Sequence, residues 1–305
     1  MFSKLKILIN QPLAKHLTMR VNQVAKYFVE IRSIEGLINS MVWVKKQNLP
    51  FFILGGGSNI VFIHNYSGLV IKNSINEIKV LRSSSREVDL EVSSGVSVSF
   101  LIAKAIEMGL SGFEHHQGLP GTVGGAIYMN SKWTKPIIYF SDKLISAKLL
   151  TTNGKLKEVK KDYFEFAYGF SILQKTKEII ISAVFRLPRE KVNLLRKITS
   201  DSLIYRKTTQ PFGVATSGCL FKNISKKERE KLNLPTNSAG YLIDQCGLKN
   251  YKVGGFMISP IHANFIVNVG KQNSRPEDLV KLVKYIKDKV KEKFDINLVE
   301  EVQLV

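Results

Sequence analysis

The sequence predicts an α+β protein with more than one domain. Segments of strand and helix character mix irregularly along the 305 residues, and the chain contains no internal repeat and no low-complexity linker. With 44% hydrophobic residues it can bury a real core, and it is long enough to divide into two or three domains. We place the boundaries so that the domains comprise residues 1–70, 71–190 and 191–305.

The first domain is predicted to contain a helix between two strands. The run Tyr27–Ile31 is rich in aromatic and β-branched residues, as strands are. A helix is expected from Ser33 to about Gln47, because apolar residues recur there at helical spacing, and it must end before Pro50. The apolar run Phe51–Leu54 follows and again has strand character.

The second domain is predicted to be a mostly antiparallel sheet with one helix. Alternating or β-branched residues mark several strands, and Asn153-Gly154 is typical of a hairpin turn. The helix is expected over Val98–Met108, closed by Gly109, and Pro188 ends the domain. The strands expected to form this sheet are Leu144–Thr151, Leu156–Val159 and Ile179–Phe185. Two further strands, Leu69–Ile71 and Val88–Val92, are predicted earlier in the chain.

The third domain is predicted to contain a polar helix over about Glu190–Tyr205 and an amphipathic helix near the end of the chain. In that second helix Leu279, Val283, Ile286 and Val290 repeat at helical spacing, and the lysines of the densest basic run fall mostly on other faces. We expect Pro276 to begin it and Ser274 or Asn273 to cap it.

The net charge of +20, from 45 basic and 25 acidic residues, raises the possibility of nucleic-acid binding. Because the basic run lies on the exposed faces of one predicted helix, a charged, solvated surface explains it better. We therefore expect no nucleic acid as partner, although a positive field would attract an anionic small molecule. No run of about 18 apolar residues and no signal peptide is found, which predicts a cytoplasmic protein without membrane contact.

Two glycine-rich segments carry the strongest functional signal. Gly118–Asn130 reads GLPGTVGGAIYMN, and Gly55–Asn59 reads GGGSN directly after a predicted strand. Glycine permits positive φ and close approach to the main chain, and exposed amides in such turns bind anionic oxygens such as phosphate. Neither segment has the G-x-G-x-x-G or P-loop pattern, which disfavours the common nucleotide-binding folds.

With these landmarks in place, the chain resembles the UDP-N-acetylenolpyruvoylglucosamine reductase family nearly from end to end, and resembles its shorter type, which lacks an extra tyrosine loop. The resemblance is carried by segments that occur in family order: Ala25–Val29, Ile53–Ile60, Gly118–Asn130, Ser217–Asn223, Ser238–Asp244, Gly247–Lys249, His262–Asn268 and Glu301-Val302.

The resemblance implies a two-lobed FAD-binding module of the PCMH/VAO type, formed by the first two domains, and a smaller α+β substrate-binding domain. It implies reduction of UDP-N-acetylglucosamine enolpyruvate to UDP-N-acetylmuramate with NADPH, in peptidoglycan precursor synthesis, by a protein expected to be a monomer. The cofactor-binding residues it implies are Gly55, Gly56, Gly57, Ser58, Asn59, Gly118, Pro120, Gly121, Thr122, Gly124, Gly125 and Ala126.

The family motifs also imply the catalytic residues. The proton donor, usually serine, corresponds to Cys219, whose thiol is a stronger acid than an alcohol. The family carboxylate corresponds to Glu301, and a conserved tyrosine to Tyr168. Cys246 is interpreted as a small buried residue, since two cysteines without C-x-x-C spacing indicate neither a metal site nor a disulfide framework.

One departure from the family pattern concerns charge. Where the family has an arginine that steadies the enolate, this chain has Gly169. A missing cation opposite a developing anion would cost a few kcal/mol of transition-state stabilisation unless another takes its place. Arg206 and Lys207 are the nearest candidates along the chain, and Arg206 is assigned to the substrate site.

The remaining assignments concern the substrate and two adjacent histidines. The resemblance implies that Lys222, Asn223 and His262 contact the substrate. His115 and His116 have no metal-site spacing, and we interpret them as loop residues beside the flavin. Two alternatives remain open: another flavin-dependent oxidoreductase of the same fold, and a basic nucleotide- or nucleic-acid-binding protein without catalysis.

Overall fold

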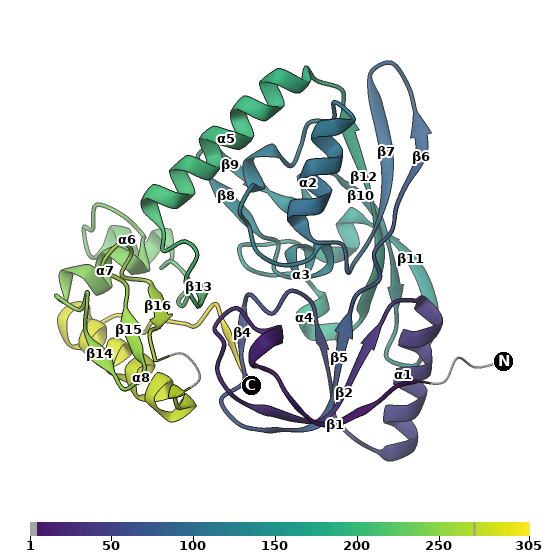
Figure 1. Cartoon of the computed structure of the whole chain (residues 1–305). Helices are drawn as coiled ribbons and strands as arrows, with labels where there is room; N and C mark the ends of the chain where they lie inside the picture. The colour runs from purple at the N-terminus through teal and green to yellow at the C-terminus, as the bar shows by residue number, and fades with distance from the viewer. Residues whose placement is uncertain (1–4, 271–272) are drawn as a thin grey trace. The chain divides into compact units, whose positions relative to one another are not determined.

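The computed structural model describes residues 5–270 and 273–305, which form two compact units (Figure 1). Unit 1 contains Tyr27–Gly56, Gly68–Tyr205 and the described residues up to Ile9. Unit 2 contains Asn10–Lys26, Gly57–Ser67 and the described residues from Arg206 to Val305. Each unit therefore gathers segments that are distant in the sequence, and the predicted division at residues 70 and 190 stays a prediction.

A four-stranded sheet in the order β1-β2-β5-β3 carries the first glycine segment. Its strands are β1 (Leu8–Pro12), β2 (Val24–Ile31), β5 (Tyr66–Asn73) and β3 (Phe51–Leu54), with β3 parallel to β5. Helix α1 (Ile34–Gln47) contributes Leu37 and Val44 to the core beside this sheet. Both strands and the helix predicted for this region are confirmed. Ser33 caps α1 by accepting a hydrogen bond from the Gly36 amide at 3.0 Å, and α1 ends at Asn48 in the left-handed region.

A five-stranded antiparallel sheet forms the centre of unit 1, which confirms the predicted topology. Helix α2 (Val98–Glu107) and the short helix α3 (Val123–Tyr128) lie on one face of this sheet (Figure 1). The strands, in sheet order, are β11 (Leu156–Lys160), β10 (Leu144–Leu150), β12 (Ile179–Pro188), β7 (Glu87–Ser93) and β6 (Ile78–Ser83). Helix α3 was not predicted; it occupies the second half of the glycine-rich segment.

Smaller elements complete unit 1. Strands β8 (Lys132–Thr134) and β9 (Ile137–Tyr139) form a hairpin after α3, and α4 (Leu173–Thr176) is a single turn. Helix α5 (Val192–Thr209) is the predicted polar helix and continues past the end of the unit at Tyr205. Short 3-10 helices cover Ala14–His16, Glu114–His116, Phe140–Lys143 and Lys161–Phe164, the first of them in unit 2.

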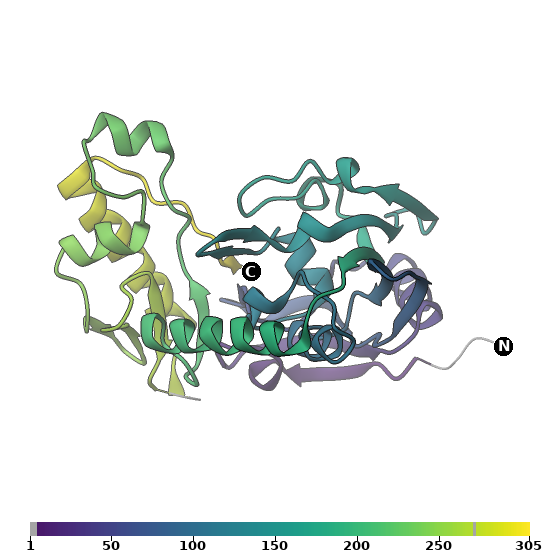
Figure 2. The same ribbon diagram turned by 90° about the horizontal axis from the view of Figure 1, so that it is seen from above.

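Unit 2 is built on an antiparallel sheet in the order β13-β16-β15-β14, covered by helices. The long helix α8 (Pro276–Phe294) packs against β14, β15 and α7 (Figure 2). The other elements are β13 (Thr216–Cys219), β16 (Phe265–Asn268), β15 (Phe256–Ile258), β14 (Lys252–Val253), α6 (Lys226–Lys231) and α7 (Ala239–Gln245). A separate parallel pair joins β17 (Gln303–Leu304) to β4 (Ile60–Val61).

The predicted buried face of α8 is confirmed, but its predicted cap is wrong. Leu279, Val283, Ile286 and Val290 are buried, and Pro276 is the first helical residue. Arg275 occupies the cap position without a side-chain cap bond. The Ser274 hydroxyl is engaged elsewhere, because it donates to the Asn268 amide oxygen at 2.5 Å. Tertiary contact thus outcompetes the local capping preference.

No helix in the described parts of the chain combines the length and apolar character that a membrane span requires.

Candidate active site

The two glycine segments lie backbone against backbone in unit 1. A Cβ atom added to Gly56 would stand 2.3 Å from the Gly121 Cα, and one added to Gly55 would stand 2.6 Å from the Thr122 hydroxyl oxygen. Only glycine permits this approach, since real Cβ atoms do not come so close to main-chain atoms. Gly121 also adopts a φ of 121°. The predicted juxtaposition of the two segments is therefore present as a cradle of main-chain groups.

The second segment turns from this cradle into helix α3. Thr122 is the cap residue and accepts from the Gly125 amide at 3.4 Å. The Gly124 amide donates to the Ser94 carbonyl at 2.8 Å, and a Cβ on Gly124 would meet the Ser94 side chain at 2.9 Å. Ala126 is buried below the turn, whereas Gly125 is exposed. Gly118, with a φ of 78°, and the exposed Pro120 form the entry to the turn.

Lys72 is a charged residue in this region that the sequence analysis missed. Its ammonium group donates to the Gly55 carbonyl. Burial lowers the pKa of Lys72, and the neighbouring Glu30 carboxylate opposes that shift. The signal was a lysine at the end of the buried run Leu69–Ile71, where a solvated charge is out of place. Lys72 holds the first glycine turn and adds positive charge beside it.

The last residues of the first glycine segment belong to unit 2. Gly57, with a φ of 66°, packs so closely on the His16 carbonyl that a Cβ would stand 2.1 Å from it. The Asn59 side-chain amide donates to the Glu301 carbonyl at 3.1 Å. The Asn59 main-chain carbonyl accepts a hydrogen bond from the Gln303 amide at 3.0 Å. Asn59 is therefore tied to the segment that leads into strand β17.

Cys219 and Glu301, two predicted catalytic residues, are brought to neighbouring backbone positions. Cys219 ends strand β13, where it pairs with Phe265. The Glu301 amide donates to the carbonyl of Leu220, the residue after Cys219, at 2.8 Å. The next residue, Phe221, forms an isolated bridge with Glu300. Main-chain hydrogen bonding thus joins the two segments of unit 2 that carry the predicted proton-transfer residues.

The surroundings distinguish Glu301 from its neighbour Glu300. The Glu300 carboxylate forms a 2.9 Å ion pair with the Lys287 ammonium on helix α8. Glu301 stands at a bend of the chain, directly after the bridge that Glu300 forms with Phe221. The Glu300 carboxylate is thus engaged with Lys287, and Glu301 stays the predicted catalytic carboxylate.

Arg206 and Lys207 were proposed as the nearest cations, and Arg206 is the one whose charge interacts with Cys219. Burial lowers the pKa of the Arg206 guanidinium, and the ionised form of the Cys219 thiol would oppose that shift. One arm of the guanidinium donates to the Gln210 side chain at 3.1 Å. Lys207, in contrast, is exposed and lies 5.3 Å from the centre of the Phe212 ring.

Lys222, Asn223 and His262 also lie in unit 2, around the start of helix α7. The Asn223 side chain accepts from the Ala239 amide at 3.2 Å, and the Lys222 amide donates to the Val299 carbonyl at 2.8 Å. Burial lowers the pKa of His262, and its Nδ1 atom accepts from the Asn264 amide at 3.2 Å. These contacts orient the segment, and its role toward a substrate stays a prediction.

Tyr168 lies in unit 1, on a tight turn fastened to the end of helix α3. Ala167 and Phe170 bridge across the turn, and Gly169 has a φ of 60°. The Asn130 side chain donates to the Ala167 carbonyl at 3.1 Å. The Gln174 side chain donates to the Gly169 carbonyl at 3.0 Å and to the Tyr128 carbonyl at 3.1 Å. Helix α3 therefore connects the glycine cradle to the Tyr168 turn.

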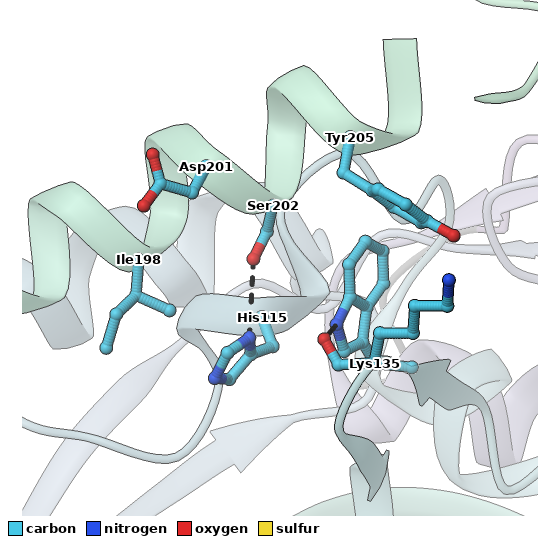
Figure 3. A pocket seen from close by; sticks show the side chains of 7 residues that line it. His115, Lys135, Ile198, Asp201, Ser202 and Tyr205 are labelled. Atoms are coloured by element: carbon cyan, nitrogen blue, oxygen red, sulfur yellow. Dashed lines mark hydrogen bonds between the residues drawn. The ribbon is translucent and has the colours of Figure 1, made fainter. Parts of the chain in front are cut away.

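The two adjacent histidines lie in a 3-10 helix, which corrects their interpretation as loop residues. His116 is buried and packs edge-on against Phe140 with the ring centres 5.4 Å apart. His115 contacts the Ser202 hydroxyl across a distance of 3.3 Å. Figure 3 shows His115, Ser202 and Tyr205 around a pocket of about 240 Å³, which Asp201, Ile198, Trp133 and Lys135 also line.

Comparison with protein families gives two matches. Residues 210–305 match the model for the UDP-N-acetylenolpyruvoylglucosamine reductase C-terminal domain, and residues 25–160 match an FAD-binding domain. The second match contains both glycine segments, and the first contains Cys219 and Glu301.

Individual relatives are similar over nearly the whole chain. The UDP-N-acetylenolpyruvoylglucosamine reductase of Chlamydia felis is 35% identical over 96% of this chain and 92% of its own length. That of Bacillus subtilis is 33% identical over 98% of this chain and 94% of its own length. The crystal structure of the Thermus caldophilus reductase superposes with a TM-score of 0.79 at 26% identity, covering 99% of this chain and 98% of the other.

Proposed function

The chain belongs to the UDP-N-acetylenolpyruvoylglucosamine reductase family, and from this premise we propose how its residues carry out that reduction. The reaction converts UDP-N-acetylglucosamine enolpyruvate to UDP-N-acetylmuramate with NADPH as reductant, in peptidoglycan precursor synthesis. The observation that carries the proposal is the hydrogen bond from the Glu301 amide to the carbonyl of Leu220, the residue after Cys219, at 2.8 Å. Cys219 and Glu301 were assigned from motifs that are far apart in the sequence.

The glycine cradle fits the pyrophosphate of FAD. Gly55 and Gly56 let the first segment pack directly on Gly121 and Thr122 of the second, and a Cβ at either glycine would push the two segments apart. Such concave amides bind anionic oxygens, and the Lys72 ammonium adds positive charge. When bound, FAD supplies the hydride transfer from NADPH to the substrate. The chain itself contributes binding, orientation and protons.

The residues of unit 2 supply the proton chemistry. Hydride addition to the methylene carbon of the enolpyruvyl group leaves negative charge shared between the adjacent carbon and the carboxylate. The Cys219 thiol donates its proton to that adjacent carbon, which completes the new C–H bond and leaves a thiolate. The half-buried Arg206 guanidinium favours the thiolate, because opposite charges attract more strongly in a partly desolvated site than in water. Glu301 orients the carboxyl side and exchanges the proton.

We also propose that the protein acts as a monomer in the cytoplasm and belongs to the shorter type of its family. These proposals rest on the resemblance described above. Size-exclusion chromatography with light scattering tests the oligomeric state, and a dimer mass would contradict it.

The proposed reaction is tested by following the flavin spectrum of the purified protein under anaerobic conditions. NADPH is expected to bleach the absorbance near 450 nm, a typical value for oxidised flavins. Addition of the enolpyruvyl nucleotide should then restore the absorbance as UDP-N-acetylmuramate forms. If the nucleotide leaves the flavin reduced, the proposed substrate is wrong.

A further inference from the structure

A cation lies directly against Tyr168, the turn residue predicted to be catalytic. The Lys132 ammonium stands 4.0 Å from the centre of the Tyr168 ring. Both side chains are half-buried. Because partial burial weakens screening by water, a charge held there acts more strongly than one on an exposed side chain.

The lysine is positioned by the strand that carries it. Lys132 begins strand β8, two residues after Asn130, whose side chain holds the Ala167 carbonyl of the Tyr168 turn. Asn130 thereby links strand β8, which begins two residues later, to the Tyr168 turn. Ser141 supports Asn130 by donating its hydroxyl proton to the Asn130 side-chain oxygen at 2.7 Å.

Trp133, the next residue of strand β8, anchors the opposite face of that strand. Trp133 is 4% exposed, and its indole N–H donates to the Lys135 carbonyl at 2.6 Å. Its ring packs edge-on against Tyr205 at 5.7 Å, on the wall of the pocket drawn in Figure 3. Since side chains alternate along a strand, burial of Trp133 on one face directs Lys132 to the opposite face.

The turn itself provides no charge. Gly169 has no side chain and is buried in the left-handed region, where larger residues are strained. Lys175 lies 5.4 Å from the Phe170 ring of the same turn, but it is exposed. Among the described residues of this turn and its contacts, Lys132 is thus the half-buried cation that lies against Tyr168.

We propose that Lys132 supplies the positive charge of the Tyr168 site and stabilises the substrate carboxylate as negative charge builds on it during reduction. A preorganised cation near a developing anion lowers the barrier because no solvent has to reorganise around it. The ammonium also favours hydrogen-bond donation by the Tyr168 hydroxyl, since positive charge near a phenol stabilises its anion. This inference rests on the function proposed above and adds a charged residue to that site.

The test compares the two half-reactions in Lys132→Met, Lys132→Arg and the control Lys175→Met by anaerobic stopped-flow absorbance. In Lys132→Met, reoxidation by the enolpyruvyl nucleotide should slow about 100-fold, while bleaching by NADPH should stay within about twofold of the parent protein. Lys132→Arg should recover most of the rate because it keeps the charge. Lys175→Met should match the parent protein in both half-reactions.

A second variant separates charge from local folding. Lys132→Ala should reoxidise slowly, and added ethylammonium chloride should accelerate it at least about fivefold over equal sodium chloride, because the free cation can occupy the vacated position. Reoxidation of Lys132→Met at the parent rate, or equal slowing in Lys175→Met, would overturn the inference alone. A parent protein that the nucleotide cannot reoxidise would overturn the proposed function together with this inference.

Discussion

The glycine cradle of unit 1 and the Cys219 cluster of unit 2, which comprises Cys219, Arg206 and Glu301, are built in opposite ways. The cradle consists of main chain, and its shape depends on side chains that are absent at Gly55 and Gly56. The cluster consists of functional groups from distant segments, joined by main-chain hydrogen bonds such as that from Glu301 to Leu220. The cradle should therefore be sensitive to any added atom, and the cluster to the identity of a single group.

The largest expected effect is at Cys219. Replacing Cys219 with alanine removes the proposed proton donor and should slow substrate-driven reoxidation of the flavin about 100- to 10,000-fold. Bleaching by NADPH should be unchanged, since it needs no proton from the thiol. The measurement is anaerobic stopped-flow absorbance.

Cys246 provides the matched control for that change. Its thiol contacts the Lys289 carbonyl at 3.5 Å, and burial raises the pKa of Cys246. Cys246→Ala should leave both half-reactions unaltered. Equal rates for Cys219→Ala and the parent protein would remove Cys219 from the mechanism.

The cradle should respond to a single methyl group. Gly56→Ala places a Cβ 2.3 Å from the Gly121 Cα, which should destabilise the protein by about 3 kcal/mol and reduce the flavin retained on purification. Urea unfolding and the ratio of flavin to protein absorbance measure the two effects.

Gly125→Ala is the control for the stability part of the cradle prediction, because it adds the same methyl group where the protein leaves room for it. A Cβ there would meet only the Thr122 hydroxyl, at 3.7 Å, and the residue lies exposed in α3. Alanine in a helix should raise the free energy of unfolding by about 0.5 kcal/mol. If Gly56→Ala and Gly125→Ala unfold at the same urea concentration, close packing of the two segments is not what shapes the cradle.

The adjacent carboxylates of unit 2 allow a sharper comparison. Glu301→Gln should slow reoxidation about tenfold or more, because the amide cannot exchange a proton. Glu300→Gln breaks the ion pair with Lys287, which should cost less than about 1 kcal/mol of stability without altering the rate. Stopped-flow traces and urea unfolding of both variants measure this, and an inverted pattern would reassign the catalytic carboxylate to Glu300.

The smallest expected effect is a difference in acid sensitivity between the units. Burial lowers the pKa of His262, so the unfolded state binds its proton first as the pH falls below about 6.5. The free energy of unfolding of unit 2 should then fall by less than about 1 kcal/mol, and this loss ends once the pH has passed the lower pKa of His262 in the folded state. In unit 1, hydrogen bonds from Arg186 lower the pKa of Asp89. The stability that the ionised Asp89 contributes is therefore lost only below about pH 4.

Hydrogen exchange, corrected for intrinsic rates, measures this difference in strands β16 and β7. Between about pH 6.5 and 5, protection should fall in β16 and persist in β7. His262→Gln should remove the decrease in β16, because glutamine does not titrate. A decrease that persists in His262→Gln would assign the acid sensitivity to another group.

Local patterns predicted most of the fold. The sequence indicated α1, α2, α5, α8 and the antiparallel strands, because periodicity and turn residues act over short distances. It failed where a tertiary contact overrode a local preference, as at Ser274, and where a short helix lay inside a glycine-rich segment, as in α3. The candidate site was predicted residue by residue from motifs, whereas Lys72 and Lys132 belong to no motif and were missed.

The sequence by itself determined the two glycine segments, the order of the family motifs and the identities of Cys219 and Glu301, because each is a property of a short stretch of chain. Only the tertiary structure decided that the Glu301 amide bonds to the residue after Cys219, that Lys72 supports Gly55 and that Lys132 faces Tyr168. The physical reason is that such contacts depend on how distant segments pack, which no local periodicity records.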